Sequence, residues 1–150
     1  MKKVIVFIFV IVIAVVCIVY SRYMNYKKIK LATYNINKEF LAYQNSKIRI
    51  NTVISLMGSA IEKNKKNDIQ MDETKHFYEN DVNSIKLYLE VKSSDEVTIV
   101  RIPMEELIIG EKAGSDKVEK AFGESFFIFS DIKYHEKSGQ VSQIVFKEIE

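Results

Sequence analysis

The side chains that could hold a metal ion or transfer protons are few and lie far apart in the sequence. The two histidines, His76 and His135, are not part of an HxxxH or HExxH pattern, and the single cysteine, Cys17, lies near the N-terminus. A zinc site or a hydrolytic pair would therefore have to be assembled by the fold alone. We expect each histidine on a strand, at its surface or edge, and we predict no metal site.

Other candidates for catalysis are explained by local structure. Ser125 follows Gly123 but lacks the second glycine of a nucleophile elbow. Glu105 and Glu106 come soon after Pro103, and carboxylates are favoured in the first turn of a helix. The chain also lacks a glycine-rich phosphate loop, a dinucleotide-binding fingerprint and a pair of cysteines. We therefore predict that the protein is not an enzyme and binds no cofactor.

Asp131, Lys133 and His135 alternate along a predicted strand, which would place all three side chains on one face. The residues of the opposite parity are apolar or aromatic: Ile128, Ile132 and Tyr134. Because an apolar face is buried first, we expect the face with the three titratable residues to be solvated rather than to form a site.

The secondary-structure elements that position these residues follow an apolar stretch near the N-terminus. Residues 4–20 are 17 consecutive apolar residues, about 25 Å as a helix against about 30 Å for the hydrocarbon core of a bilayer. Lysines before the stretch, and tyrosines with Arg22 after it, would extend it into the interface. We predict a membrane anchor over residues 1–22. Its spanning positions include Val4, Phe7, Ile11, Val15, Cys17 and Tyr20.

A cleaved signal peptide is the alternative, because it also begins with basic residues before an apolar segment. No site of the Ala-x-Ala type follows, and Val16 before Cys17 does not suit lipoprotein processing. We therefore expect an uncleaved, single-pass signal-anchor in the cell membrane, with Cys17 an inert apolar residue. Basic residues flank both ends, but the short basic tail favours a cytoplasmic N-terminus and an extracytoplasmic domain.

Charge divides the rest of the chain into a basic connector and an acidic domain. Residues 21–48 carry six cations against Glu39 alone, whereas residues 49–150 carry 14 cations against 19 anions. A basic stretch beside a membrane is attracted to anionic headgroups, although simple solvation explains it equally well. The acidic domain argues against nucleic acid as a partner.

The connector, residues 23–45, is predicted to be an amphipathic helix. One stripe repeats with spacings of 3 and 4 and forms a candidate interaction seam: Tyr26, Ile29, Thr33, Ile36, Phe40 and Tyr43. An aromatic stripe needs a partner in water, which could be the protein's own domain, a second copy in a coiled coil, or another subunit. The sequence leaves open whether anchor and connector form one continuous helix.

Residues 46–150 predict a small α+β domain in which helices cover one face of an antiparallel sheet of about five strands. A helix is expected over 50–64, with Asn51 as its N-cap and a stop at 64–67, followed by a polar loop to residue 75. Two short helices are expected next. One opens at Pro103 and stops at Gly110, and the other runs from a Ser115 cap to Gly123.

The strands are predicted from alternation and from turn-forming residues between them. Residues 76–79, 85–91 and 97–102 are expected to form an antiparallel meander, with Ile85, Leu87 and Leu89 on the buried face of its central strand. Residues 126–136 and 141–149 are expected to pair through a hairpin in which Gly139 has a positive φ.

Three of these segments resemble ones in uncharacterised small single-pass membrane proteins of anaerobic Gram-positive bacteria: TVISLMGSAIEKN, ENDVNSIKL and DIKYHEKSGQVSQIVF. The resemblance implies membrane attachment in a bacterium and no particular activity. A weaker likeness is to type IV pilins and pseudopilins, which join an apolar N-terminal helix to an amphipathic half packed on a sheet. The chain departs from them in having no glycine before the apolar run and no acidic residue before Glu39.

These features together predict a membrane-anchored, non-catalytic protein of the cell envelope whose acidic domain binds a partner protein or associates with other copies. The first alternative is a structural subunit of a pilus-like or secretion assembly. The second is a ligand sensor or an enzyme that uses a pocket between helix and sheet.

Overall fold

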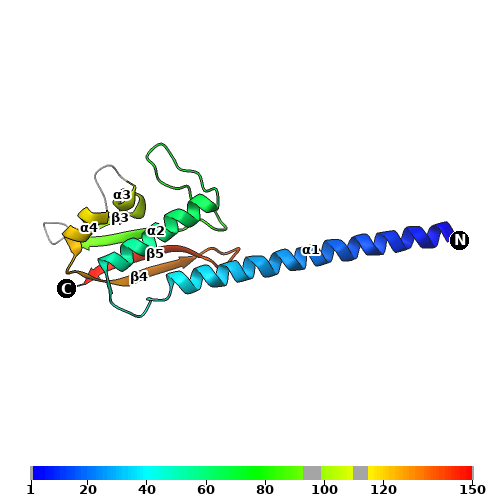
Figure 1. The fold of residues 1–150 in the computed structure, drawn as a ribbon, viewed down its shortest axis with the longest axis horizontal. Helices are drawn as coiled ribbons and strands as arrows, with labels where there is room; N and C mark the ends of the chain where they lie inside the picture. The colour runs from blue at the N-terminus through cyan, green and yellow to red at the C-terminus, as the bar shows by residue number, and fades with distance from the viewer. Residues whose placement is uncertain (1, 93–98, 110–114, 150) are drawn as a thin grey trace.

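The structure of the protein is a computed structural model that describes residues 2–92, 99–109 and 115–149. It confirms an α+β fold in which a long N-terminal helix leads to a second helix and a five-stranded sheet (Figure 1). The helices are α1 (Lys2–Phe40), α2 (Ile50–Lys66), α3 (Met104–Ile108) and α4 (Ser115–Phe122). The strands are β1 (Ile48–Arg49), β2 (Lys86–Lys92), β3 (Ile99–Pro103), β4 (Phe126–Tyr134) and β5 (Val141–Ile149).

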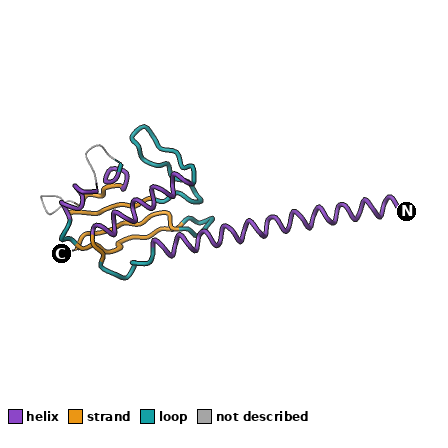
Figure 2. The backbone as a smooth tube through the Cα atoms, viewed as in Figure 1, coloured by secondary structure: helices purple, strands orange, loops and turns teal. Residues whose placement is uncertain are grey.

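Helix α1 runs without a break for 39 residues, which corresponds to about 58 Å. It contains neither proline nor glycine, so nothing in the sequence kinks it between the predicted anchor and the connector. Its N-terminal part projects away from the domain, and only its last turns contact it (Figure 1, Figure 2). The helix ends at Phe40 and turns follow over residues 41–45, so the connector is helical over less than its predicted range.

The sheet has the order β1-β4-β5-β2-β3 and is mixed. Three pairs are antiparallel, but β2 and β5 are parallel, with Leu87 opposite Ile144 and Leu89 opposite Phe146. The prediction of a wholly antiparallel sheet was therefore wrong at this pair. The reason is topological: β5 turns back from β4 through the hairpin and enters the sheet beside β2, which already runs in the same direction.

The predicted strand over residues 76–79 does not form. This segment makes one isolated bridge, between Met71 and Phe77, and the Phe77 side chain is buried in the core. The Asp72 carboxylate accepts hydrogen bonds from the backbone N–H groups of Thr74 and His76, each at 2.9 Å, and so favours a turn over a ladder. The fifth strand is instead β1, whose two residues pair with the start of β4.

The sheet has one face covered by helices and one face that no described helix covers. On the covered face, Leu87, Leu89, Ile144 and Phe146 pack with α2 and the end of α1 in one hydrophobic core. Val145 is equally buried but does not belong to that core, which places it on the opposite side of the sheet. We call that side the open face. It carries Arg49, Lys86, Tyr88, Glu90, Lys92, Ile99, Arg101, Phe126, Ile128, Asp131, Lys133, Gln143, Val145 and Lys147.

The helix ends differ from the prediction in detail. Arg49, rather than Asn51, is the N-cap of α2, and it makes no side-chain capping bond. The chain enters the helix directly from β1, so Ile50 is already helical, and Asn51 Oδ1 accepts from the N–H of Thr52. Pro103 caps α3 as the last residue of β3. The predicted stop at Gly110, the start of the strand over 97–102 and the side chain of Ser115 lie outside the described residues.

Two glycines give a matched test of backbone conformation. Gly139, in the hairpin between β4 and β5, has φ +68°, a region that costs an L-residue about 1–2 kcal/mol. Gly58 lies in the interior of α2, and a Cβ added there would meet nothing within 4 Å. We expect Gly139→Ala to destabilise the protein by about 1 kcal/mol and Gly58→Ala to stabilise it by about 0.5–1 kcal/mol. Urea unfolding of the full chain in detergent would measure both, and shifts of the same sign would contradict the assigned backbone geometry.

Candidate functional site

The predicted spanning positions lie on the freely projecting part of α1. Phe7, Ile11, Val15, Cys17 and Tyr20 are all exposed, and the side chain of Val4 is outside the described residues. Within the described residues, this is a helix long and apolar enough to cross a membrane, a property that a signal sequence shares. No other part of the described protein packs against this stretch.

The candidate interaction seam divides into two parts. Phe40 is completely buried in the core, and Thr33 and Ile36 are partly buried against the domain. Tyr26 and Ile29 are on the same helix face but lie beyond the domain and are more than half exposed. Tyr43 is in the turn after the helix and is also exposed. The protein's own domain therefore covers only the C-terminal part of the seam.

Polar residues that the sequence analysis did not single out hold α1 to the domain. Asn37 uses both ends of its amide: Nδ2 donates to the carbonyl of Gly139 and Oδ1 accepts from the N–H of Val141, each at 2.9 Å. A weaker contact joins Thr33 Oγ1 to the carbonyl of Ser138 at 3.4 Å. The hairpin between β4 and β5 is thereby fixed to the helix. Only the position of Asn37 next to the stripe hinted at this role.

A second polar contact joins α1 to α2. Glu39 Oε2 lies 2.8 Å from Lys63 Nζ, and Oε1 accepts a hydrogen bond from Ser59. Burial alone would raise the pKa of the Glu39 carboxyl, but the hydrogen bonds from Lys63 and Ser59 and the charge of Lys63 outweigh it and keep the pKa below its ordinary value. The carboxylate is therefore the form that stabilises this junction.

A polar pocket of about 360 Å³ lies at the end of the sheet where the β4–β5 hairpin contacts α1. The N-terminal ends of β2 and β5, the C-terminal end of β4 and the loop around Asn80 line it. Its charged side chains have both signs, and Lys137 is paired with Asp81 at 2.8 Å. The pocket lies between strand ends and a loop, not between helix and sheet as the sensor alternative proposed.

The histidines do not meet in this pocket, which contains His135 alone. His135 was expected at a surface or strand edge, but it lies just beyond β4, only 7% exposed, with Nε2 2.7 Å from the carbonyl oxygen of Ser84. His76 is in a loop rather than on a strand, with Nδ1 2.9 Å from Thr74 Oγ1 and Nε2 3.6 Å from Glu106. Among the described residues no group of three or more His, Cys, Asp or Glu side chains could hold a metal ion.

The simple alternation predicted for β4 is broken by two shifts in its pairing with β5, at Phe129/Asp131 and at Lys133/Tyr134. Asp131 and Lys133 lie on the open face, as the solvated face of the prediction requires, but His135 turns inward. Ile128, expected on the opposite side, shares the open face with Asp131 and Lys133 because the irregularity at residue 130 changes the parity.

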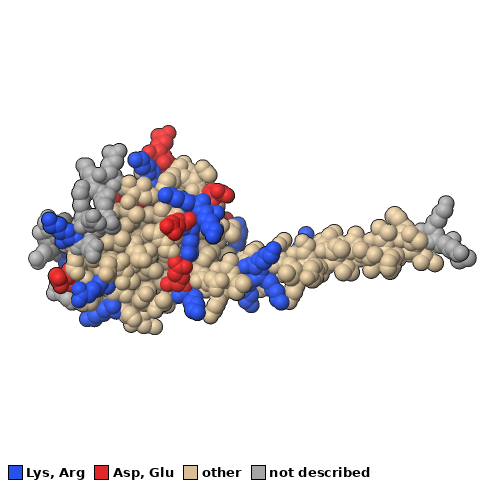
Figure 3. Space-filling view, in the orientation of Figure 1, with Lys and Arg blue, Asp and Glu red and all other residues tan. Residues whose placement is uncertain are grey.

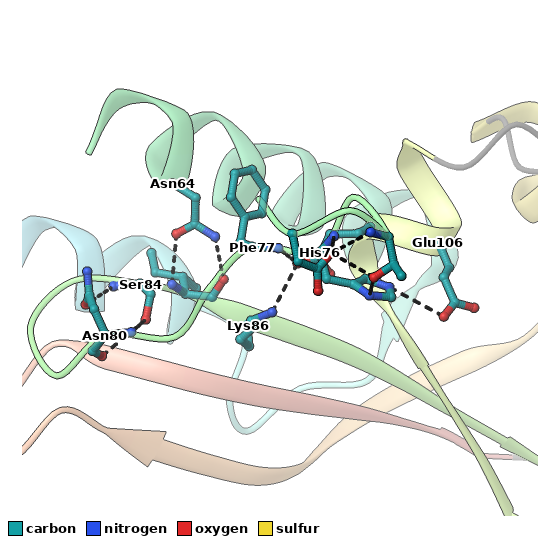
Figure 4. A network of polar contacts seen from close by, with 11 residues as sticks. Asn64, His76, Phe77, Asn80, Ser84, Lys86 and Glu106 are labelled. Carbon is teal, nitrogen blue, oxygen red and sulfur yellow. Dashed lines mark hydrogen bonds and ion pairs between the residues drawn. The ribbon is translucent and has the colours of Figure 1, made fainter. Parts of the chain in front are cut away.

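The most buried charges form an ion pair at the edge of the sheet. Glu105 is 2% exposed, and its Oε1 accepts from the N–H of Phe77 at 3.1 Å and from Lys86 Nζ at 3.4 Å (Figure 4). Its Oε2 has no hydrogen-bond partner within the described part of the chain. Both Glu105 and Glu106 are in the first turn of α3, as predicted, and Glu106 is 57% exposed. The buried ion pair of Glu105 is an additional role that its place in the first turn did not indicate.

Two further polar side chains, Asn64 and Tyr88, lie near this ion pair. The Asn64 side chain of α2 is fully buried and makes two hydrogen bonds of 2.8 Å, to the N–H and to the carbonyl of Ile85 (Figure 4). Burial, together with the negative charges of Glu79 and Glu105, raises the pKa of the Tyr88 hydroxyl. These polar contacts join α2, α3 and β2, so we interpret their role as stabilising the fold.

Comparisons of the chain with models of protein families, with curated proteins and with solved structures found no match.

Proposed function

We propose that the protein is a single-pass, membrane-anchored, non-catalytic envelope protein whose domain binds a partner or associates with other copies. One observation carries the proposal: an apolar stretch and a connector form one helix, and the end of that helix is built into the core of the domain. A helix so fixed acts as a stiff stalk, because α1 cannot swing without losing the contacts of Phe40, Asn37 and Glu39.

The stalk sets the distance between domain and membrane. Residues 21–32 separate the apolar stretch from Thr33, the first residue partly buried by the domain, and they span about 18 Å. The polar layer of a bilayer is about 5–8 Å thick on each side, so the domain stands clear of it. The expected orientation, with the N-terminus in the cytoplasm and the domain outside, belongs to this proposal.

Cations gather on α1 between the domain and the uncharged stretch (Figure 3). These are Arg22, Lys27, Lys28 and Lys30, which we call the basic collar. Lys27 also lies over the ring of Tyr23, 5.0 Å from its centroid. The lysines stand about 10–15 Å beyond Tyr20, from where their side chains can reach back to lipid phosphates.

The collar gives a test of lipid attraction. We expect Lys27→Gln/Lys28→Gln/Lys30→Gln to reduce the enrichment of phosphatidylglycerol over phosphatidylcholine around the protein at least about twofold, since each lysine near an anionic surface contributes about 1 kcal/mol. Mass spectrometry of lipids retained by protein taken from mixed vesicles would measure it. Lys65→Gln/Lys66→Gln, at the exposed end of α2, is the control and should leave the enrichment of phosphatidylglycerol unchanged.

The anchor and its orientation can be tested with one cysteine. Glu73 is exposed in the loop after α2, so a Glu73→Cys variant in a Cys17→Ser background would carry a single reactive thiol on the domain. Labelling of intact cells by a membrane-impermeant maleimide, with the full-length chain retained in carbonate-washed membranes, is the expected result. A chain shortened at its N-terminus would indicate a cleaved signal sequence, and protection until lysis would indicate a cytoplasmic domain.

A pilus-like structural subunit is the second candidate. It is favoured by the continuity of α1 and by the packing of its end on the sheet, which leaves the apolar half free to pack against other helices. Filaments containing the chain would support this candidate, whereas dispersed protein with an intact Met1 would contradict it.

A further inference from the structure

The open face of the sheet differs in charge from the domain that carries it. Residues 49–150 have five more anions than cations, but the described residues of the open face include only two anions, Glu90 and Asp131. Six cations share that face: Arg49, Lys86, Lys92, Arg101, Lys133 and Lys147. Lys86 is paired with the buried Glu105 and Arg101 with Glu90, so the cations that the proposal uses are the exposed Arg49, Lys133 and Lys147. Only the strand register shows this separation, because these residues are scattered in the sequence.

The open face also combines arginine with aromatic and aliphatic side chains. Arg49 lies over the ring of Phe126 at 5.2 Å from its centroid, and Arg101 lies over Tyr88 at 5.8 Å. Two of the three arginines of the chain are thus on this face. Ile99 is 59% exposed and Phe126 is 36% exposed, so apolar surface reaches solvent between the cations. Arginine and aromatic residues are enriched in protein interfaces, and apolar groups form their cores.

The direction of the open face suits a neighbour on the same membrane. The long strands β4 and β5 run roughly along the axis of α1 (Figure 1), so the face lies alongside the stalk direction rather than across it. A surface that faces sideways from an anchored stalk meets other proteins standing on the same membrane.

We propose that the open face is a docking surface for an acidic protein partner, and this inference rests on the proposed role of the domain in partner binding. Carboxylates of the partner would pair with Arg49, Lys133 and Lys147, which are exposed, and its apolar groups would cover Ile99 and Phe126. A phosphate polymer would satisfy the cations but would leave that apolar surface in water. The apolar component therefore favours a polypeptide.

The test uses the full chain in neutral detergent and two probes, a random copolymer of glutamate and tyrosine and inorganic polyphosphate. The background carries the glutamine substitutions of the basic collar, so that those cations do not contribute. We expect the copolymer to bind, and Arg49→Glu/Lys147→Glu to weaken binding at least about tenfold. Lys65→Glu/Lys66→Glu, on the exposed end of α2, should change the affinity less than about twofold.

A second substitution separates a polypeptide partner from a general polyanion. Ile99→Ser is expected to weaken binding of the copolymer about threefold and to leave the affinity for polyphosphate unchanged. Only the copolymer has apolar groups to place against Ile99. The proposal would be overturned if polyphosphate bound as tightly as the copolymer at equal charge and salt. It would also be overturned if the Lys65→Glu/Lys66→Glu control lost as much affinity for the copolymer as Arg49→Glu/Lys147→Glu. Arg49→Gln/Lys147→Gln should show the same direction of change if the glutamate variant fails to fold. Since the assay needs no membrane, its failure is distinguishable from a failure of the anchoring experiment.

Discussion

Lys86→Met is expected to lower the free energy of unfolding by about 3–5 kcal/mol, because it removes one partner of a buried ion pair and leaves the other uncompensated. Glu105 is 2% exposed, and within the described residues it accepts hydrogen bonds from two donors, Lys86 and the N–H of Phe77. Without the lysine, the carboxylate would retain one donor in a site closed to water. Urea unfolding of the full chain in detergent, followed by circular dichroism, would measure the change.

Two further variants isolate the cause of that loss. Lys133→Met removes a lysine from the same open face, but from an exposed position, so we expect a change within about 0.5 kcal/mol. Lys86→Met/Glu105→Gln removes the buried charge while keeping an acceptor for the N–H of Phe77, and should recover most of the stability. If Lys86→Met costs no more than Lys133→Met, the ion pair does not have the burial that the structure gives it.

The same ion pair shows where sequence reasoning stops. Glu105 and Glu106 are adjacent and equally suited to a helix start, and the pattern offers no means of telling them apart. Burial of the first and exposure of the second follow from the edge of β2, where Lys86 and Phe77 meet α3. Those contacts join residues 19 and 28 positions apart, so no local rule contains them.

Local signals did predict most of the elements. Alternation of Ile85, Leu87 and Leu89 with polar residues placed β2, and all three are completely buried. The spacing of apolar residues placed α2, and glycine in the hairpin placed the positive φ at Gly139. Strand β1 could not be predicted, because two residues are too few to show alternation.

The pairing partners of the strands, and the face of the sheet on which each side chain lies, were harder to predict from the sequence. The parallel contact of β2 with β5 depends on how the terminal hairpin returns to the sheet, which neither strand encodes by itself. On β4, an irregularity at residue 130 exchanged the two faces, so a parity count that was right at one end of the strand was wrong at the other. The open face with its cations became visible only after the register was known.

Phe40→Ala is the second change with a large expected effect, a loss of about 3–5 kcal/mol, as for other fully buried phenylalanines. Phe40 is 0% exposed and ends α1 inside the core, beside the contacts of Glu39 and Asn37. Removing the ring should therefore release the stalk as well as weaken the core. Hydrogen exchange should show lost protection over residues 33–40 and in the hairpin that Asn37 holds.

Tyr26→Ala is the matched control, because Tyr26 lies on the same stripe of α1 and is also aromatic, but is 62% exposed. We expect its effect on unfolding in detergent to stay within about 0.5 kcal/mol. Comparable losses from Phe40→Ala and Tyr26→Ala would mean that the stripe acts as one surface with an additional partner. A large loss of stability from Phe40→Ala alone would mean that the C-terminal part of the stripe stabilises the fold. Tyr26 and Ile29 would then be free for contacts beside the membrane.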